Sequence, residues 1–177
     1  MPRAVHPAVA TPMREVEAVV ALGANLGDIQ QTFVRAIEAL ALLSRRAVEV
    51  AGVYRSAPWQ AHGPDYLNTV CVLHTPLCAP DLLRALQQIE TAAGRERPHV
   101  NAPRTLDLDL IFYGAALIES PRLVVPHPRW ALRAFVMEPL AELRPDRVNA
   151  ALRQAAHDPS LKRLGDWAVW SASSAGE

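Results

Sequence analysis

Two aspartates separated by a single residue, Asp107 and Asp109, are the side chains in this sequence best suited to chemistry. They alternate with Leu106, Leu108 and Leu110, and a strand with this pattern turns its leucines to one face and its aspartates to the other. The two carboxylates then lie roughly 7 Å apart on one face. Oxygen ligands at this spacing suit Mg²⁺, which binds one or two carboxylates together with substrate phosphates. A solvated edge strand with its charges outward is the alternative interpretation.

Several arginines precede this strand and could bind the phosphates of a metal-bound substrate. Arg95 and Arg97 lie in a loop interrupted by Pro98, and Arg104 stands three residues before Asp107. A guanidinium group binds phosphate oxygens in pairs, so arginines beside two carboxylates are typical of polyphosphate sites. A loop closed by salt bridges is the simpler alternative for Arg95 and Arg97.

The N-terminal part of the chain predicts a strand followed by a helix. Residues 16–22 form a short apolar run that ends at Gly23, as in a buried strand. The turn G-A-N-L-G leads to Asp28, which is expected to cap a helix over residues 28–44. A glycine-rich turn of this kind can bind phosphate, but neither established phosphate-loop pattern is present. We therefore interpret these glycines as residues of a tight turn.

A second strand over residues 47–54 and a third over residues 65–75 are predicted on either side of an irregular loop, residues 55–64. Long loops in compact domains are often functional, and Trp59 in this loop could cover a planar ligand. A tryptophan that only anchors its own loop is equally common. Tyr66 and Asn68 share one face of the third strand and could bind a heterocycle.

A second helix is predicted to begin with Pro80 in its first turn and to end near Gly94. Gln87 and Glu90 lie three residues apart outside its apolar stripe, and their spacing alone predicts an exposed pair. After the aspartate strand we expect an extended piece over residues 122–126 and short helices near residue 130 and from Met137. One or two further small helices are expected between residues 152 and 170.

This order of elements predicts an α+β fold, a ferredoxin-like antiparallel sheet with helices packed on one face, plus short C-terminal helices. The aspartates then face the open side of the sheet. We expect a disordered N-terminal extension over residues 1–14, a single domain over residues 15–170 and a frayed tail over residues 171–177.

The composition excludes several classes of protein. The chain has 177 residues, of which 50% are hydrophobic, and this is sufficient for one substantial core. Its formal net charge is zero, so there is no overall basic character to favour nucleic acid or a membrane surface. No apolar run reaches the ~18 residues that a membrane span requires. The two cysteines are too few for a disulfide framework, which favours a reducing cytoplasm.

Five motifs resemble, in the correct order, the 6-hydroxymethyl-7,8-dihydropterin pyrophosphokinase family of folate biosynthesis. They are A-L-G-A-N-L-G-D, Y-R-S-A-P-W, G-P-D-Y-L-N, P-R-T-L-D-L-D-L and R-L-V-V-P-H-P-R-W, the last followed by Arg133 and Phe135. The resemblance covers about residues 19–143, and P-R-T-L-D-L-D is its most specific part. It implies transfer of a pyrophosphoryl group from ATP to the hydroxymethyl oxygen of the pterin, with release of AMP.

The resemblance also implies roles for individual residues. Asp107 and Asp109 would hold two Mg²⁺ ions that bridge the triphosphate of ATP, the co-substrate. Arg95 and Arg97 match catalytic arginines of a loop that closes over ATP. Further nucleotide and phosphate contacts would come from Gln87, Glu90, Arg104, Arg122, Leu123, His127 and Arg133. The pterin slot would be formed by Ser56, Ala57, Trp59, Tyr66, Asn68 and Phe135.

Within that slot, Asn68 would hydrogen-bond the pterin edge and Phe135 would stack on the ring. The chain departs from the family pattern at Asn101, where a tryptophan is frequent, at Ala57, which replaces a proline, and at Pro128, where a tyrosine is common. These differences affect the substrate loops and leave the residues of the reaction intact. The implied partners are the two small-molecule substrates, with no nucleic acid, no membrane and a monomeric chain.

Two other functions are compatible with a ferredoxin-like sheet. An RNA-recognition module stacks bases on sheet aromatics, but this chain lacks the aromatic RNA-binding string and places aspartates on the sheet. A ligand-sensing domain without catalysis is the other alternative, and the intact aspartates and arginines argue against it.

Overall fold

The computed structural model describes residues 14–58, 63–94 and 105–173. The predictions outside these residues concern the N-terminal extension, the end of the C-terminal tail, Trp59, Arg95, Arg97, Asn101 and Arg104. The first elements are β1 (Val16–Ala24), α1 (Ile29–Leu42), β2 (Glu49–Val50), β3 (Val53–Ser56), β4 (Tyr66–Thr75), α2 (Ala79–Ala92) and β5 (Asp107–Tyr113). They are followed by β6 (Ile118–Glu119), β7 (Val124–Val125), η1 (Trp130–Leu132), α3 (Ala134–Leu143), η2 (Pro145–Arg147), α4 (Ala150–Ala155), β8 (Lys162–Gly165) and α5 (Trp167–Ala172).

The main sheet has the strand order β5-β1-β4-β3-β8, with β2 also paired to β4, and every pairing is antiparallel. β4 lies between β1 and β3, so β1, α1 and β3 form a split β-α-β unit. β4, α2 and β5 form a second split unit around β1. Two interleaved units of this kind make the ferredoxin-like fold, and this prediction is confirmed.

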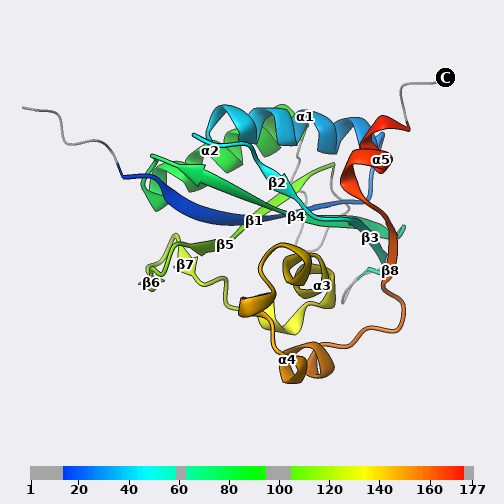
Figure 1. The fold of residues 1–177 in the computed structure, drawn as a ribbon. Coiled ribbons are helices and arrows are strands. Elements are labelled where there is room, and N and C mark those ends of the chain that lie inside the picture. Colours follow the sequence, from blue (N-terminus) through cyan, green and yellow to red (C-terminus); the bar gives the residue numbers. More distant parts are fainter. Residues whose placement is uncertain (1–13, 59–62, 95–104, 174–177) are drawn as a thin grey trace, which may run out of the picture.

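Helices cover the two faces of the sheet unequally (Figure 1). α1 and α2 lie on one face, over a core that includes Phe33 and Leu86. α1 and α2 are the two helices that the sequence predicts on one face of the sheet. α3 covers part of the opposite face, where Met137 packs with Val19 and Val70 of the sheet. Apolar strand residues on that face therefore obtain their cover from α3.

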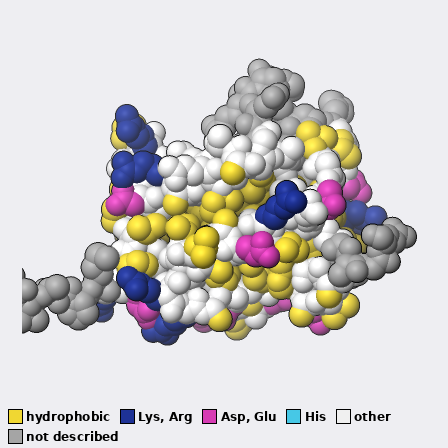
Figure 2. All heavy atoms as spheres, turned by 90° about the horizontal axis from the view of Figure 1, so that it is seen from above, with side chains coloured by type: hydrophobic (Ala, Val, Ile, Leu, Met, Phe, Trp, Pro, Cys, Tyr) yellow, Lys and Arg dark blue, Asp and Glu magenta, His cyan; other side chains and the backbone are white. Residues whose placement is uncertain are grey.

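The outer surface of α1 and α2 carries hydrophobic side chains along its middle (Figure 2). A groove between the two helices is lined largely by small residues, among them Ala36, Ala39, Ala85, Ala92 and Ala93. Leu106 also lines it and belongs to the core on this side of the sheet. The aspartates face the other side, so this groove is separate from them.

The local sequence explains where the two long helices begin and end. α1 begins where the Asp28 carboxylate accepts a hydrogen bond from the backbone N–H of Gln31 at 2.9 Å. α2 has Pro80 in its first turn and is followed by Gly94 at a φ of +77°, a conformation that favours glycine. The predicted limits agree within two residues. Within the described residues, no helix is long and apolar enough to cross a membrane.

The strand predicted over residues 47–54 is divided into β2 and β3 at Gly52. The Gly52 N–H donates to the carboxylate of Glu142 at 2.9 Å instead of to a neighbouring strand. A Cβ at this position would lie only 2.7 Å from Nη2 of Arg163. Side chains from distant parts of the chain therefore interrupt the strand.

The C-terminal part is only partly helical. α4 and α5 are the two small helices expected there, but the prediction is wrong for Lys162–Gly165, which form β8. β8 pairs with β3, whose N–H and C=O groups would otherwise form an unpaired edge. α3 also begins earlier than predicted, at Ala134.

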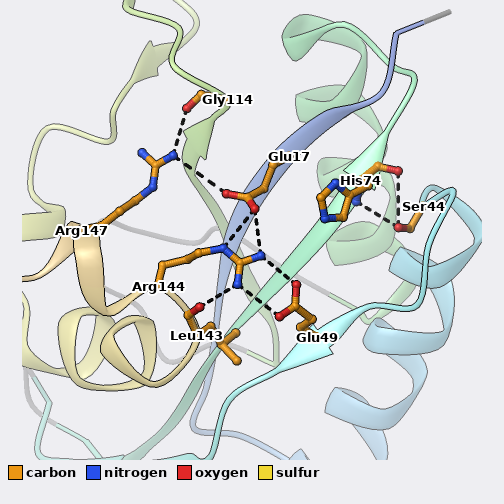
Figure 3. A network of polar contacts seen from close by, with 8 residues as sticks. All are labelled: Glu17, Ser44, Glu49, His74, Gly114, Leu143, Arg144 and Arg147. Carbon is orange, nitrogen blue, oxygen red and sulfur yellow. Dashed lines mark hydrogen bonds and ion pairs between the residues drawn. The ribbon is translucent and has the colours of Figure 1, made fainter.

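Arg144, directly after α3, ties this helix to two strands (Figure 3). Its guanidinium group lies 2.8 Å from Glu17 of β1 and 2.7 Å from Glu49 of β2, while Arg147 approaches Glu17 at 3.9 Å. The hydrogen bond from Arg144 lowers the pKa of Glu49, although partial burial acts in the opposite direction. Since this pKa is lowered in the folded state, the pair contributes stability above the ordinary glutamate pKa. That contribution is lost as the pH falls through the lowered pKa.

We expect Arg144→Ala to reduce the free energy of unfolding by about 2 kcal/mol at pH 7, because it removes hydrogen bonds to two carboxylates. The difference from wild type should shrink at acidic pH, where protonated glutamates no longer gain from the arginine. Urea unfolding at several pH values measures both effects. Arg84→Ala, which removes an exposed pair with Asp81 inside α2, is the control and should have a much smaller effect. Equal losses of unfolding free energy in the two variants would show that the contacts of Arg144 with Glu17 and Glu49 do not stabilise the fold.

Candidate functional site

Asp107 and Asp109 lie on β5, an edge strand of the sheet, and face the side on which α3 packs. Leu108 and Leu110 are buried on the opposite side, against the core under α1 and α2. The alternation predicted from the sequence is therefore confirmed. Both aspartates are partly exposed, and the side chain of Asp109 retains 31% of its surface. The strand thus presents two carboxylates on a face that a ligand can reach.

Two basic residues from the segment before α3 approach Asp109. Nη1 of Arg133 donates to Oδ2 of Asp109 at 2.9 Å, and Nε2 of His127 lies 3.8 Å from the same oxygen. The backbone N–H of His127 donates to the carbonyl of Ile111 at 3.0 Å, which holds this residue beside β5. Burial lowers the pKa of His127, and the charge of Asp109 opposes this effect. The structure therefore brings together three residues that the sequence assigns to the site.

Gly23 separates the aspartates from a second polar group. In the sheet register, Gly23 pairs with Asp107 of β5 on one side and with Asn68 of β4 on the other. Directly opposed residues of antiparallel strands face the same side, so Asp107 and Asn68 share a face with their Cα atoms roughly 10 Å apart. A Cβ at Gly23 would come within 3.3 Å of Oδ1 of Asn68. Between the two polar groups the sheet therefore presents backbone atoms and no side chain.

The second polar group centres on Asn68. Its amide donates to the hydroxyl of Ser56 at 3.0 Å, and both residues are buried. Tyr66 pairs with Ser56 between β4 and β3 and faces the same side. Phe135, in the first turn of α3, has its ring centroid 5.7 Å from the guanidinium carbon of Arg133. The amide and hydroxyl of this group, with Tyr66 on the same face, suit a planar polar heterocycle.

Gln87 and Glu90 differ sharply in their environment. Gln87 is exposed, whereas Glu90 is only 3% exposed and accepts a hydrogen bond from the Leu108 N–H at 2.7 Å. The exposed pair expected from spacing is therefore wrong for Glu90, because that side of α2 packs against the beginning of β5. Leu108 stands between the two aspartates, so Glu90 fixes the strand that carries them.

The remaining predicted residues have different locations. Ala57 is exposed directly after β3, and Arg122 is exposed before β7. Leu123 is buried in the core beneath α1 and α2, away from the face of the aspartates. The structure does not place the residues outside the described ranges, Trp59, Arg95, Arg97 and Arg104.

Sequence reasoning gives no site role to Gly23 or Asn25. Gly23 lies inside β1, so its interpretation as a turn residue is wrong, whereas Gly27, with a φ of +71°, is a turn residue. Asn25 is buried, and its amide donates to the carbonyl of Pro64 at 3.2 Å, which connects the end of β1 to the segment before β4. A glycine inside a strand often marks a position where a ligand or another backbone comes close to the strand. Gly23, at the end of the predicted strand, is the sequence signal for this part of the site.

A family model described as 7,8-dihydro-6-hydroxymethylpterin-pyrophosphokinase (HPPK) matches residues 19–145. The chain belongs to the HPPK family. A 2-amino-4-hydroxy-6-hydroxymethyldihydropteridine pyrophosphokinase of Synechocystis is 45% identical over 133 residues, which cover 75% of this chain and 68% of the relative. A protein of the same name from Pseudomonas aeruginosa is 45% identical over 144 residues, with coverages of 80% and 87%.

Solved structures of HPPK-DHPS proteins share the fold. An HPPK-DHPS in complex with substrates has a TM-score of 0.60 at 11% identity and covers 84% of this chain. A Plasmodium falciparum HPPK-DHPS with pteroate has a TM-score of 0.56 at 10% identity and covers 89% of this chain. At this identity the similarity establishes the fold alone. This chain spans about half the length of these two, 47% and 48%.

We expect Glu90→Ala to reduce the free energy of unfolding by about 1–3 kcal/mol, because the buried N–H of Leu108 would lose its acceptor. Glu90→Gln keeps an acceptor oxygen at the same place and should lose less. Urea denaturation of the ligand-free protein measures both. Gln87→Ala, on the exposed side of α2, is the control and should remain close to wild type. A Glu90→Ala protein as stable as the control would show that this hydrogen bond does not hold β5.

Proposed function

We propose that this chain transfers the pyrophosphoryl group of ATP to the hydroxymethyl oxygen of 6-hydroxymethyl-7,8-dihydropterin, with Asp107 and Asp109 as Mg²⁺ ligands. As a member of the HPPK family it is a pyrophosphokinase of folate biosynthesis. The observation that carries the residue assignment is the row formed by Asp107, Gly23 and Asn68 on one face of the sheet. This row sets a carboxylate pair for metal-bound phosphates on the same face as the polar group of Asn68 and Ser56, so the two substrates can meet above Gly23.

The donor set fits Mg²⁺ in its chemistry. Magnesium prefers oxygen ligands and usually retains water and phosphate oxygens beside one or two carboxylates. In the part of the chain that the structure describes, no three His, Cys, Asp or Glu side chains form a complete cation site. Asp107 and Asp109 therefore suit ions whose coordination the substrate completes, and the family resemblance supports two of them. Held by Asp107 and Asp109, such ions would supply positive charge to the transferred group and to the departing AMP.

Protein side chains orient the two substrates. Asn68 and Ser56 present hydrogen-bonding groups to the pterin edge, while Phe135 offers its ring for stacking. Arg133 brings a positive charge to Asp109 and is placed to contact phosphate oxygens beside it. Tyr66, Ala57 and Trp59 complete the proposed pterin slot. From the resemblance we assign further ATP contacts to Gln87, Glu90, Arg95, Arg97, Arg104, Arg122, Leu123 and His127.

A ligand-sensing or RNA-binding domain is not favoured, because the family match is to an enzyme and the aspartate pair is intact. We further propose that the protein acts as a cytoplasmic monomer. The thiols of Cys71 and Cys78 are both free, and a reducing compartment keeps them so.

We expect Asp107→Ala or Asp109→Ala to reduce turnover by at least two orders of magnitude, because a metal ion supplies several kcal/mol of charge stabilisation. The proteins should still fold, since the change relieves repulsion between two carboxylates. AMP release at saturating Mg²⁺ measures the loss, and circular dichroism verifies the fold. Asp146→Ala, which removes a carboxylate of η2 that has no proposed role in the site, is the control. Near wild-type turnover in either site variant would exclude the pair as metal ligands.

We also expect pterin affinity to rise when Mg²⁺ and a non-hydrolysable ATP analogue are bound. Arg133 links residues assigned to the two substrates, since it contacts Asp109 and its guanidinium group lies 5.7 Å from the Phe135 ring. A nucleotide that orders Arg133 and draws in the loop of Arg95 and Arg97 would complete the pterin slot. By linkage, nucleotide affinity must rise by the same factor when the pterin binds first. Pterin fluorescence titrations with and without the analogue test this, and equal affinities would show that the slot is preformed.

A further inference from the structure

The C-terminal segment beyond the family match completes the pterin side of the sheet. The match ends at residue 145, whereas β8 begins at Lys162. β8 pairs with the outer edge of β3, the strand that ends in Ser56 and leads into Ala57. On its inner side β3 pairs with β4, which carries Asn68. β3 is therefore paired on both sides as far as Arg55, the residue before Ser56, and one of these sides is supplied by the C-terminal segment.

Glu142 of α3 connects this segment to the strand. Its carboxylate accepts hydrogen bonds from the Tyr54 hydroxyl at 2.5 Å, the Gly52 N–H at 2.9 Å and Nε of Arg163 at 2.9 Å. Burial alone would raise the pKa of Glu142, but these hydrogen bonds outweigh it and lower the pKa to about 2. Burial, followed by the contact with Glu142, raises the pKa of Tyr54. At neutral pH the carboxylate is therefore charged and the phenol is a donor.

Arg163 fits closely into this arrangement. Its guanidinium group lies against Gly52, where any Cβ would approach Nη2 to 2.7 Å. Nη2 also donates to Glu142 at 3.2 Å and to Asp166, which precedes α5. The arginine thus joins β8 to α3 and to the backbone just before β3.

The same contacts fix the position of Phe135. Phe135 and Glu142 lie seven residues apart on α3, which is about two helical turns, so both project from the same side of the helix. Anchoring Glu142 to Tyr54 and Arg163 holds that side of α3 against β3. The placement of the Phe135 ring relative to Ser56, both assigned to the proposed pterin slot, therefore depends on this anchor.

Ser160, just before β8, extends the contact one residue beyond β3. Its Oγ donates to Oδ1 of Asp158 at 2.7 Å, and its N–H bonds the same oxygen at 2.8 Å. With its proton engaged in this way, the hydroxyl presents a lone pair to the Ala57 N–H, at 3.5 Å. Ala57 is the first residue after β3 and is assigned to the proposed pterin slot.

We propose that Arg163 and Ser160 are positioning residues of the pterin site, which act by holding Ser56, Ala57 and Phe135 in place. This inference rests on the proposed function, because the pterin is the ligand concerned. Both residues lie beyond β3, on the edge of the sheet opposite to the aspartates of β5. Their loss should therefore weaken pterin binding and leave the use of ATP unchanged.

Steady-state kinetics on the full chain test this proposal. We expect Arg163→Ala to raise the KM for the pterin about fivefold, the scale of one lost ion pair, with kcat and the KM for ATP unchanged. Arg163→Lys keeps the charge without the planar pair of donors and should recover part of the loss. Ser160→Ala removes a single hydroxyl and should raise the KM for the pterin about threefold. This smaller change keeps the proposal testable if Arg163→Ala does not fold.

Arg153→Ala is the matched control. The pair of Arg153 with Glu138 also joins a C-terminal element to α3, and its side chains are 48% and 29% exposed, against 41% and 28% for Arg163 and Glu142. The control should leave both KM values unchanged. The proposal is wrong if Ser160→Ala and every folded Arg163 variant keep the wild-type KM for the pterin. It is also wrong if the KM values for pterin and ATP rise together.

Direct titration of the pterin by fluorescence separates this proposal from the proposed function. A wild-type protein that binds the pterin but releases no AMP would refute the transfer reaction, while the affinities of the variants would still decide the positioning roles. A wild-type protein that does not bind the pterin would overturn both. Affinities that fall in Arg163→Ala and Ser160→Ala but not in Arg153→Ala would support the positioning roles independently of turnover.

Discussion

Repulsion between two carboxylates on one face of an edge strand is the constraint on which the site depends. β5 must hold Asp107 and Asp109 on the same side, and neither its short length nor the low strand propensity of Asp favours this. Contacts from two directions hold the strand in place. Arg133 places a cation against Asp109 on the exposed face, and Glu90 binds the backbone between the aspartates from the other face. The carboxylates are thereby held in place while remaining accessible to substrate.

α3 connects the separate parts of this site because it is attached to the sheet at both ends. Arg133, which precedes its first turn, reaches β5 through Asp109. Near its other end Glu142 reaches β3 and β8, and Arg144 reaches β1 and β2. The helix covers the face on which the substrates are proposed to meet, and its attachments fix the width of that space. The two ends of α3 therefore serve different sides of that space, Arg133 the side of the aspartates and Glu142 the side of β3.

The bare backbone at Gly23 shows how the fold provides space for substrates. A ferredoxin-like sheet with two long helices on one face leaves the other face for additional elements. Here α3 fills part of that face, and the row from Asp107 to Asn68 on the same face has Gly23, a residue without a side chain, at its centre. The groove between α1 and α2, although apolar, lies on the wrong side of the sheet for this chemistry.

The sequence by itself determined the features that depend on near neighbours. The alternation around Asp107, the cap at Asp28 and the glycine after α2 are each encoded within a few residues, and the structure agrees with all three. The motifs also identified the family, because their order in the chain is specific. Only the tertiary structure decided that Glu90 is buried, that Gly23 lies between Asp107 and Asn68 in the sheet, and that β8 completes the sheet. In each case the deciding partner, Leu108, Asn68 or β3, lies far along the chain, and periodicity does not encode which distant groups meet.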